Sequence, residues 1–439
     1  MLYVKYIVFA VYMLILVKMI IKKEPTYLAY WFLPLFMFAW KILSLVYLET
    51  GVYAVELYRQ TYQTGADYVF LLLMSVFFAV GIASAARKHR GIQTRNKPMQ
   101  FTAVHSRFIS WAVYAHIVVL IYLYVNFALV GFSAFNNLLD FHQQARLPFV
   151  SQFGSTLTYF LLTVDGLSFF CLKRKRKTCF ALYLFSCIYM FMAGSKFTGL
   201  FQYTVFFFAP LYFAYAANGK IKLKSLFKPK VILPILTLLV ALLVIAFFRY
   251  SETSSNAMSL LISRIFDMQA GTMWSANEYI TRNNIAMFGD MDQLVKEIEA
   301  LFAGTSELDG SIGLGHVMYL SAPSYIVDTY LENGLRFSGW FLAVSYISMG
   351  YVGSLILCAL LGLIFSQIMT VMDIAFREGS VLLLALSTYE YISFFDYYRI
   401  GNFSYFFNPL NIVLLLIMLV IIFMKKRRIK LVLRRRRTI

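Results

Sequence analysis

The chain has 439 residues, of which 60% are hydrophobic and only 14% are charged, and its formal net charge is +19. Soluble domains usually carry about 25% charged and 45–50% apolar residues, so this composition excludes an ordinary soluble domain and indicates a polytopic membrane protein. The positive charge lies in short clusters beside apolar segments. That pattern is typical of cytoplasmic loops and argues against nucleic-acid binding.

Apolar segments recur along the chain, and a spanning helix needs about 20 apolar residues. We predict an all-α integral membrane protein with about eleven transmembrane helices. The first segment has no small-residue cleavage site, so we expect a retained span rather than a signal peptide. The predicted spans are 2–21, 27–47, 68–86, 108–129, 151–172, 179–193, 197–217, 231–248, 351–372, 381–395 and 406–424.

The clusters of Lys and Arg predict the orientation, because they all fall on one side of the eleven-span arrangement and basic loops stay in the cytoplasm. The N-terminus then faces outward and the C-terminus is cytoplasmic. The predicted units are a bundle of eight helices (1–249), a large outward loop (250–338), three further helices (339–424) and a basic tail (425–439). We expect a re-entrant or interfacial segment at 339–350. The basic clusters lie at 22–23, 87–90, 173–177, 220–230 and 425–437, with Arg377.

The outward loop 250–338 differs from the rest of the chain in charge. It contains eleven Asp and Glu against four Lys and Arg, whereas the remainder contains ten against thirty-six. Aromatic residues are spread through the loop, and disordered tracts are poor in them. Loops of this length are usually functional when they are ordered. We therefore predict a partly helical lid over an outward-facing site.

Within the loop, the segment 259–279 has the periodicity of an amphipathic helix. In a lid, Arg264 would bind phosphate, Gln269 would bind hydroxyl groups and Trp274 would stack on a sugar. The alternative is a helix on the membrane surface with Trp274 as its anchor. A second, acidic run at 290–299 is typical of a solvated helix with a plain exposed face.

Cations on the outward side are candidates for binding an anion. Lys196 follows Gly194 at the tip of the tight hairpin between spans 179–193 and 197–217. It would hold a phosphate as a point charge, or would simply reach the interface with its long side chain. Arg249 and Arg399 are either interfacial anchors or partners of Lys196 around a pyrophosphate, which guanidinium groups bind in a bidentate manner.

Candidate general bases are Asp267 and His316, with Glu278, Asp140 and His142 as alternatives. Asp165 and Glu390 lie inside predicted spans, where an ionisable residue is a functional candidate by default. The sequence has no zinc spacing, HExxH, GxSxG, Walker loop or acidic metal pair. We therefore expect neither a metal nor a cofactor.

Several short stretches resemble the polytopic O-antigen or oligosaccharide repeat-unit polymerases of bacterial surface polysaccharide assembly. Gly194-Ser195-Lys196 resembles the Gly-Ser-Arg/Lys step of those proteins, and 264–270 with Trp274 is similar to the Arg-rich start of their long loop. The span number and the single large loop are similar as well. The resemblance therefore covers essentially the whole chain.

Two further stretches in the C-terminal part carry the same resemblance. Residues 349–353, with Gly362 later, resemble the Gly-x-x-Gly start of the helix that follows the long loop in those polymerases. Arg399 matches the small outward loop near their C-terminus.

The resemblance implies a GT-C-like membrane glycosyltransferase that polymerises lipid-linked repeat units at the outer face of the bacterial inner membrane. Glycan would pass from an undecaprenyl or other polyprenyl pyrophosphate to a sugar hydroxyl. A chain-length regulator protein is an expected partner. The residues implied are Lys196, Arg249, Arg264 and Arg399 for pyrophosphate, Gln269 and Trp274 for glycan, and Asp267 or His316 as the base.

Three alternatives remain open from the sequence. An O-antigen ligase shares much of the plan but is expected to carry a functional His, and the loop offers only His316. A lipid-linked oligosaccharide flippase or other transporter needs a polar path to both faces, whereas the charged candidates gather on the outward side. A non-catalytic scaffold would tolerate loss of Lys196 and Arg264.

Overall fold

The computed structural model describes residues 2–23, 28–92, 103–131, 141, 144–194, 197–217, 247, 257–303, 310–332 and 336–437. Several predictions lie outside these ranges: the span 231–248, the boundary at 249/250, and the candidate residues Lys196, Arg249, Asp140 and His142. The backbone of Arg264 is described, but its side chain also lies outside the description.

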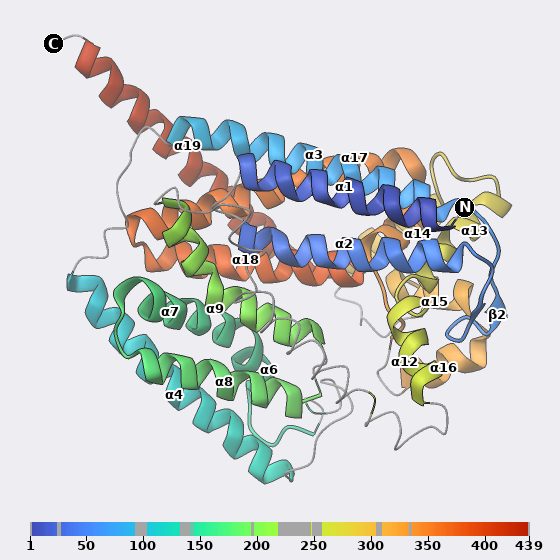
Figure 1. Cartoon of the computed structure of the whole chain (residues 1–439), viewed down its shortest axis with the longest axis horizontal. Coiled ribbons are helices and arrows are strands. Elements are labelled where there is room, and N and C mark those ends of the chain that lie inside the picture. Colours follow the sequence, from blue (N-terminus) through green and yellow to red (C-terminus); the bar gives the residue numbers. More distant parts are fainter. Residues whose placement is uncertain are drawn as a thin grey trace.

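The described helices form two neighbouring groups of rods (Figure 1). One group contains α1 (Leu2–Lys23), α2 (Leu28–Leu48), α3 (Ala66–Ile92), α17 (Phe341–Glu378), α18 (Val381–Ile400) and α19 (Pro409–Arg437). The other contains α4 (Ala103–Val130), α6 (Val150–Gln152), α7 (Thr158–Gly166) and α8 (Arg176–Met192). Helix α9 (Phe197–Ala217) packs against both α7 and α2 and so joins the two groups.

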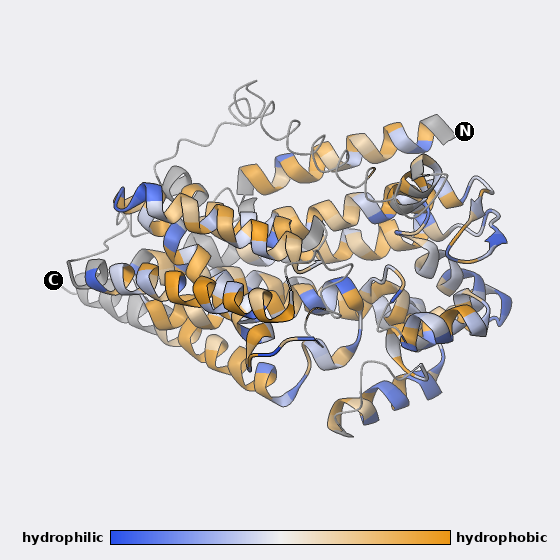
Figure 2. Ribbon diagram, turned by 90° about the horizontal axis from the view of Figure 1, so that it is seen from below, coloured by the Kyte–Doolittle hydropathy of each residue, from blue (hydrophilic) through white to orange (hydrophobic). Residues whose placement is uncertain are grey.

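Within the described ranges, six helical segments are long and apolar enough to cross a membrane: Val4–Ile21, Tyr30–Leu48, Ala66–Ala85, Arg107–Val130, Val150–Leu172 and Phe341–Phe376. Hydrophobic residues colour most of the length of the rods in Figure 2, while hydrophilic residues concentrate towards the two ends. The prediction of an all-α, multi-pass membrane protein is confirmed. The count of eleven spans remains a prediction. Each predicted span other than 231–248 coincides with described helix, and shorter apolar stretches occur at Gly199–Leu211 and Pro409–Met424.

The predicted span 151–172 is helical throughout but not uniformly α-helical. Helix α7 is flanked by two π-helical stretches, η2 (Phe153–Leu157) and η3 (Leu167–Leu172). At the first, the hydroxyl of Thr158 donates to the carbonyl of Phe153 at 2.5 Å. Because π-helical turns widen the backbone, hydroxyl groups of this kind commonly satisfy the displaced carbonyls.

The long loop is helical and gathers at one end of the molecule, together with the start of α1 (Figure 1). We call this the loop end. It contains α12 (Ala257–Phe266), α13 (Gly271–Arg282), α14 (Met291–Ala303), α15 (Gly313–Ser321), α16 (Ser324–Glu332) and the short helix η4 (Phe403–Tyr405). A small antiparallel hairpin of β1 (Tyr53–Ala54) and β2 (Arg59–Gln60) joins them.

The single helix expected over 259–279 is wrong, because the chain breaks at 267–270 into α12 and α13. The side chain of Ser263 donates to the carboxylate of Asp267 at 2.5 Å, and the amides of Asp267 and Met268 both bond to the carbonyl of Ser263. These bonds close the end of α12. The next helix then starts at Gly271, where a side chain would press against Leu57.

Helix α17 is broken at Gly350, whose backbone angles (φ 62°, ψ −163°) are available to glycine but not to L side chains. The loop segment before α14 fills the break. The amide of Tyr351 donates to the carbonyl of Ala286 at 2.7 Å, and the amide of Asp290 donates to Ile347 at 2.7 Å. Residues 341–349 thus form a separate helical segment at the position where a re-entrant or interfacial segment was predicted.

Close packing of small residues holds the bundle together at its centre. Helix α17 makes its most extensive contact with α3, where Gly362 faces the backbone of Phe77 and Gly81. A β-carbon on Gly362 would lie 2.5 Å from the carbonyl oxygen of Phe77. Small residues at such crossings let helix backbones approach closely in a membrane. Aromatic rings, including Trp31 and Phe365 at 4.7 Å between centroids, fill the surrounding core.

Candidate functional site

A buried lysine marks the place where the loop meets the bundle. Lys41 lies on α2, has almost no exposed surface, and donates from Nζ to the backbone oxygen of Gln269 and to Oγ of Ser338 at 3.3 Å. Both acceptors are uncharged. The charges of Glu56 and Arg399 are close enough to act on Lys41 through space. A cation in such a low-dielectric place is expensive unless an anion is near.

The segment 336–340 returns from the loop to the bundle and joins Lys41 to the end of α18. A β-carbon on Gly339 would lie 3.0 Å from the carbonyl oxygen of Ile400, so the two backbones touch. Arg399 stands one residue earlier on α18, with 40% of its side chain exposed and Nη2 3.5 Å from Oδ1 of Asp396. We define Lys41 and Arg399, whose charges act on each other through space, as the basic cluster. A buried guanidinium nitrogen of Arg336 has no hydrogen-bond partner among the described residues.

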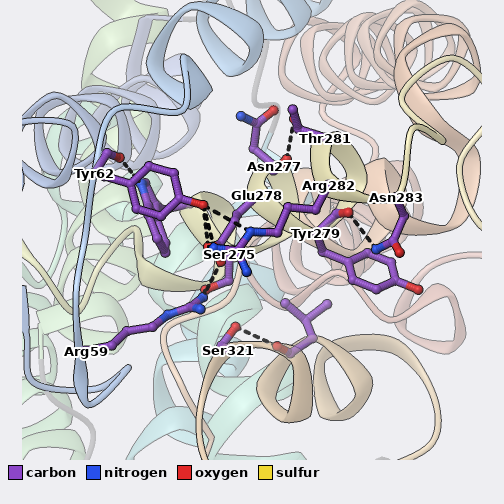
Figure 3. Close-up of polar contacts among 12 residues, drawn as sticks. Arg59, Tyr62, Ser275, Asn277, Glu278, Tyr279, Thr281, Arg282, Asn283 and Ser321 are labelled. Carbon is purple, nitrogen blue, oxygen red and sulfur yellow. Dashed lines mark hydrogen bonds and ion pairs between the residues drawn. The ribbon is translucent and has the colours of Figure 1, made fainter.

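Two other arginines at the loop end share one carboxylate (Figure 3). Glu278 on α13 is nearly buried, and its two carboxylate oxygens lie 2.5 Å from Arg59 Nη2 and 2.8 Å from Arg282 Nη2. The hydroxyl of Tyr62 donates to the same carboxylate at 2.6 Å. These contacts fasten the β1–β2 hairpin to α13. They also occupy Glu278, which was an alternative general-base candidate, and its one carboxylate offsets only one of the two guanidinium charges.

Trp274 is a core residue at this junction. Its ring is fully enclosed, its indole N–H donates to the carbonyl of Tyr62 at 3.0 Å, and the guanidinium of Arg59 lies 4.9 Å from its ring centroid. A sugar cannot stack on a ring with no exposed face, so the structure does not place Trp274 in the role suggested by the sequence. Nor does the enclosed ring act as a membrane anchor.

Gln269 lies beside Lys41, in the turn between α12 and α13. Its side-chain oxygen accepts from the hydroxyl of Ser338 at 2.8 Å, and its backbone oxygen accepts from Lys41. The hydroxyl of Thr272 donates to the carbonyl of Ser338 at 2.9 Å. The predicted hydroxyl-binding residue is therefore part of the network that seats the loop on the bundle.

The two predicted bases lie apart in different environments. Burial raises the pKa of Asp267, whose carboxylate also accepts hydrogen bonds from Ser263 and from backbone amides. Burial lowers the pKa of His316, so its imidazole is neutral at physiological pH and can accept a proton. His316 lies in the first turn of α15, and its Nε2 is buried without a partner in the described part of the chain.

Glu297 on α14 was not singled out from the sequence, where it belonged to a run interpreted as a solvated face. Burial raises its pKa to about 7, and the backbone amides of Gly313 and Phe403 donate to its carboxyl group. Next to it, the side chain of Asn402 accepts from the amide of Leu314 at 2.9 Å. Glu297 and Asn402 together connect α14 and α15 to η4, directly after Arg399. No sequence signal distinguished Glu297 from its exposed neighbours.

Asp165, a functional candidate because it lies inside a predicted span, pairs with a histidine. Its carboxylate lies 2.6 Å from Nδ1 of His116, whose Nε2 lies 3.2 Å from Oγ of Ser186. The three side chains come from α7, α4 and α8, and all are fully buried. Although this order of groups resembles a hydrolytic triad, it has no exposed surface for a substrate, and we interpret it as a structural link. Glu390 is also fully buried in α18.

Within the described ranges, no three His, Cys, Asp or Glu side chains come together in a way that would hold a metal ion. Lys41 is the functional candidate that the sequence analysis missed. Its signal was present, since a lysine in the middle of an otherwise apolar span is itself unusual. Lys196 and Arg249 lie outside the described residues, and so does the Arg264 side chain, so their convergence with the basic cluster remains a prediction.

Comparison with known proteins agrees with the resemblance inferred from the short motifs. A family of unknown function, DUF6418, matches residues 307–423. The chain is 24% identical over 255 residues to proteins named O-antigen polymerase from Salmonella typhimurium (strain LT2) and Salmonella typhi. Each alignment covers 54% of this chain and 58% of the relative, so the chain spans somewhat more than half the length of these relatives. No solved structure matches.

Proposed function

We propose that the protein polymerises lipid-linked oligosaccharide repeat units of O-antigen or a related surface polysaccharide. The proposal rests on the similarity to O-antigen polymerases and on the basic cluster at the loop end. The loop end would face the periplasm, at the outer face of the bacterial inner membrane. The basic end of α19 would lie in the cytoplasm, in agreement with the charge of its sequence.

In the proposed reaction, a sugar hydroxyl of one lipid-linked unit attacks the anomeric carbon of the growing glycan, and a polyprenyl pyrophosphate leaves. The leaving group gains negative charge, which preorganised cations stabilise. Arg399 is exposed enough to contact it, and Lys41 would add positive potential from behind. Lys196, Arg249 and Arg264 remain proposed members of the same site.

The attacking hydroxyl must lose a proton, and His316 is the better of the two proposed bases. Its imidazole is neutral, and its buried Nε2 makes no hydrogen bond to a described residue, so α15 would have to move for a sugar hydroxyl to reach it. Asp267 is less suitable because its carboxylate already accepts from Ser263. The single observation that carries the proposed function is the enclosed Lys41 near the partly exposed Arg399, at the place where the loop meets the bundle.

Deletion of the chromosomal gene followed by electrophoresis of the surface glycan tests this function. Loss of long chains, with a single repeat unit still attached to the lipid core, would support a polymerase. Loss of the single unit as well would indicate a ligase or a flippase instead. In complementation, we expect Arg399→Ala to restore few long chains, whereas the exposed Arg146→Ala should restore a normal ladder. Immunoblotting must show both variants at the level of the unmodified protein.

A further inference from the structure

Helix α14 carries a row of exposed apolar side chains. Met291, Val295, Ile298 and Phe302 recur at intervals of four, three and four residues, which places them on one face of the helix. Phe302 is 77% exposed, and Met287, four residues before the start of the helix, is 57% exposed. We define Met287, Phe288 and these four side chains as the apolar row. Contiguous exposed apolar surface of this kind usually marks an interaction site.

The opposite face of α14, which contacts the protein, holds its two most buried polar side chains beside the partly buried Leu294. Gln293 and Glu297 are only 6% and 4% exposed. An amphipathic helix on a protein in water turns its apolar face inward, so the arrangement of α14 is inverted. This arrangement indicates that the exposed apolar face of α14 does not face water.

The apolar row begins where α17 starts to cross the membrane. The amide of Val352 donates to the carbonyl of Met287 at 3.1 Å, which fixes Met287 just beyond the break at Gly350. The 26 residues from 351 to the end of the apolar segment at Phe376 extend about 39 Å at 1.5 Å per residue. That length exceeds the hydrocarbon core of about 30 Å. Gly350 therefore lies at the level of the lipid headgroups.

Beyond Gly350, α17 carries further exposed apolar side chains on the side that we expect to face lipid. Ile356, Leu360 and Leu363 are all exposed apolar residues of α17, and Ile356 follows Val352 by one helical turn. The apolar row thus extends an apolar surface that already faces lipid chains. The exposed charged residues beside the apolar row, Asp292, Lys296 and Glu299, have a net charge of −1. Attraction to anionic lipids therefore does not contribute to membrane binding by α14.

We propose that α14 is an interfacial helix whose apolar row inserts into the bilayer leaflet at the loop end. Its partner is the lipid surface itself, bound through apolar burial. The charged flanks would remain among the headgroups, as in other helices that lie in the plane of a membrane. This role is independent of the proposed enzymatic function, because it follows from the exposure of α14 and its attachment to α17.

The test places an environment-sensitive fluorophore on single cysteines in the full chain, reconstituted in phosphatidylcholine vesicles. The four native cysteines are first replaced by alanine, and each protein must be monodisperse. The fluorophore is attached at Phe302→Cys or Val295→Cys, with Glu299→Cys as the matched control on the same helix. Quenching by phospholipids with brominated acyl chains is compared with quenching by aqueous iodide.

We expect bromolipid to quench the fluorophores at 302 and 295 several-fold more than the one at 299, and iodide to show the reverse order. Replacing part of the lipid with phosphatidylglycerol should leave both patterns unchanged. Equal iodide quenching at 302 and 299 would overturn the proposal, since the apolar row would then face water. Protection at 302 from both quenchers would also overturn it, because another protein or a second copy of the chain would cover the row.

Discussion

The ammonium group of Lys41, on the second helix of the bundle, donates a hydrogen bond to the backbone oxygen of Gln269 in the long loop. Residues 228 positions apart in the sequence are thereby joined at the base of the loop. The acceptor is a carbonyl group rather than a carboxylate, so this bond does not pair Lys41 with a charged side chain. Lys41 thus places a basic group at the junction and also helps to seat the loop on the bundle.

Replacing Lys41 with Met should therefore reduce polymer formation without unfolding the protein. The variant loses a cation behind the proposed pyrophosphate site, and loss of one such stabilising group costs about 10²–10³-fold in rate. It also removes the desolvation penalty of a buried charge, so the melting temperature should change little. Glycan ladders and a melting curve in detergent check both parts. Lys18→Met, at an exposed position of α1, is the matched control. Normal ladders with Lys41→Met would contradict the role.

Glu278→Gln should loosen the β1–β2 hairpin from α13. The carboxylate holds Arg59 and Arg282, and a hydrogen bond to a charged group contributes about 1.5–3 kcal/mol. Because both arginines are partly exposed, we expect the free energy of unfolding to fall by about 1–2 kcal/mol in total. Denaturant titration in detergent measures the change. Glu299→Gln, an exposed position on α14, should have no measurable effect.

The stability of the loop end should depend on the protonation of Glu297. Burial raises its pKa from 4.5 to about 7, so the folded chain binds a proton that the unfolded chain has released. This contribution to stability is fully present below pH 4.5 and is lost as the pH rises through 7. Glutamine has nearly the same shape as glutamate but no charge. At pH 8 the free energy of unfolding of Glu297→Gln should therefore exceed that of the unmodified protein by up to about 3 kcal/mol.

Melting curves of the unmodified protein and Glu297→Gln between pH 4.5 and 8 measure this effect. The difference between the two proteins should grow with pH, and Glu299→Gln should follow the unmodified protein throughout. Parallel curves for all three would show that Glu297 titrates as an ordinary exposed carboxyl group.

Gly350→Ala should disrupt the joint between α17 and the loop. A β-carbon at this position would lie 2.4 Å from the amide nitrogen of Gly289, and the backbone φ of 62° is itself unfavourable for alanine. Strain of this kind costs about 1–3 kcal/mol before any clash is relieved. We expect a lower melting temperature and faster proteolysis of the loop. Gly271→Ala is the matched control, since its β-carbon would meet side chains rather than backbone, with Leu57 at 3.3 Å and Glu56 at 3.8 Å.

The sequence predicted the helical membrane bundle well because apolar segment length and basic clusters are local signals. The ends of α2, α4 and α9 agree with the predicted spans to within a few residues, except that α4 starts five residues earlier than predicted. Side-chain roles were harder to predict, since they depend on which surfaces meet. Trp274 was predicted to stack on a sugar because it is an aromatic residue in the long loop, yet the β1–β2 hairpin covers its ring. Glu297 had the pattern of a solvated residue, yet it faces Gly313 and Phe403.

The break in α17 determines how the loop can move. Backbone groups at 286–290 complete the hydrogen bonding of a membrane helix, with Tyr351, Val352 and Ile347 as partners. Lifting this segment away would leave several buried amide and carbonyl groups unpaired, each at about 1–3 kcal/mol. The loop therefore cannot swing open as a hinged flap at this edge. A glycan tethered to a lipid would have to approach from the side, within the plane of the bilayer, where its anchor already diffuses.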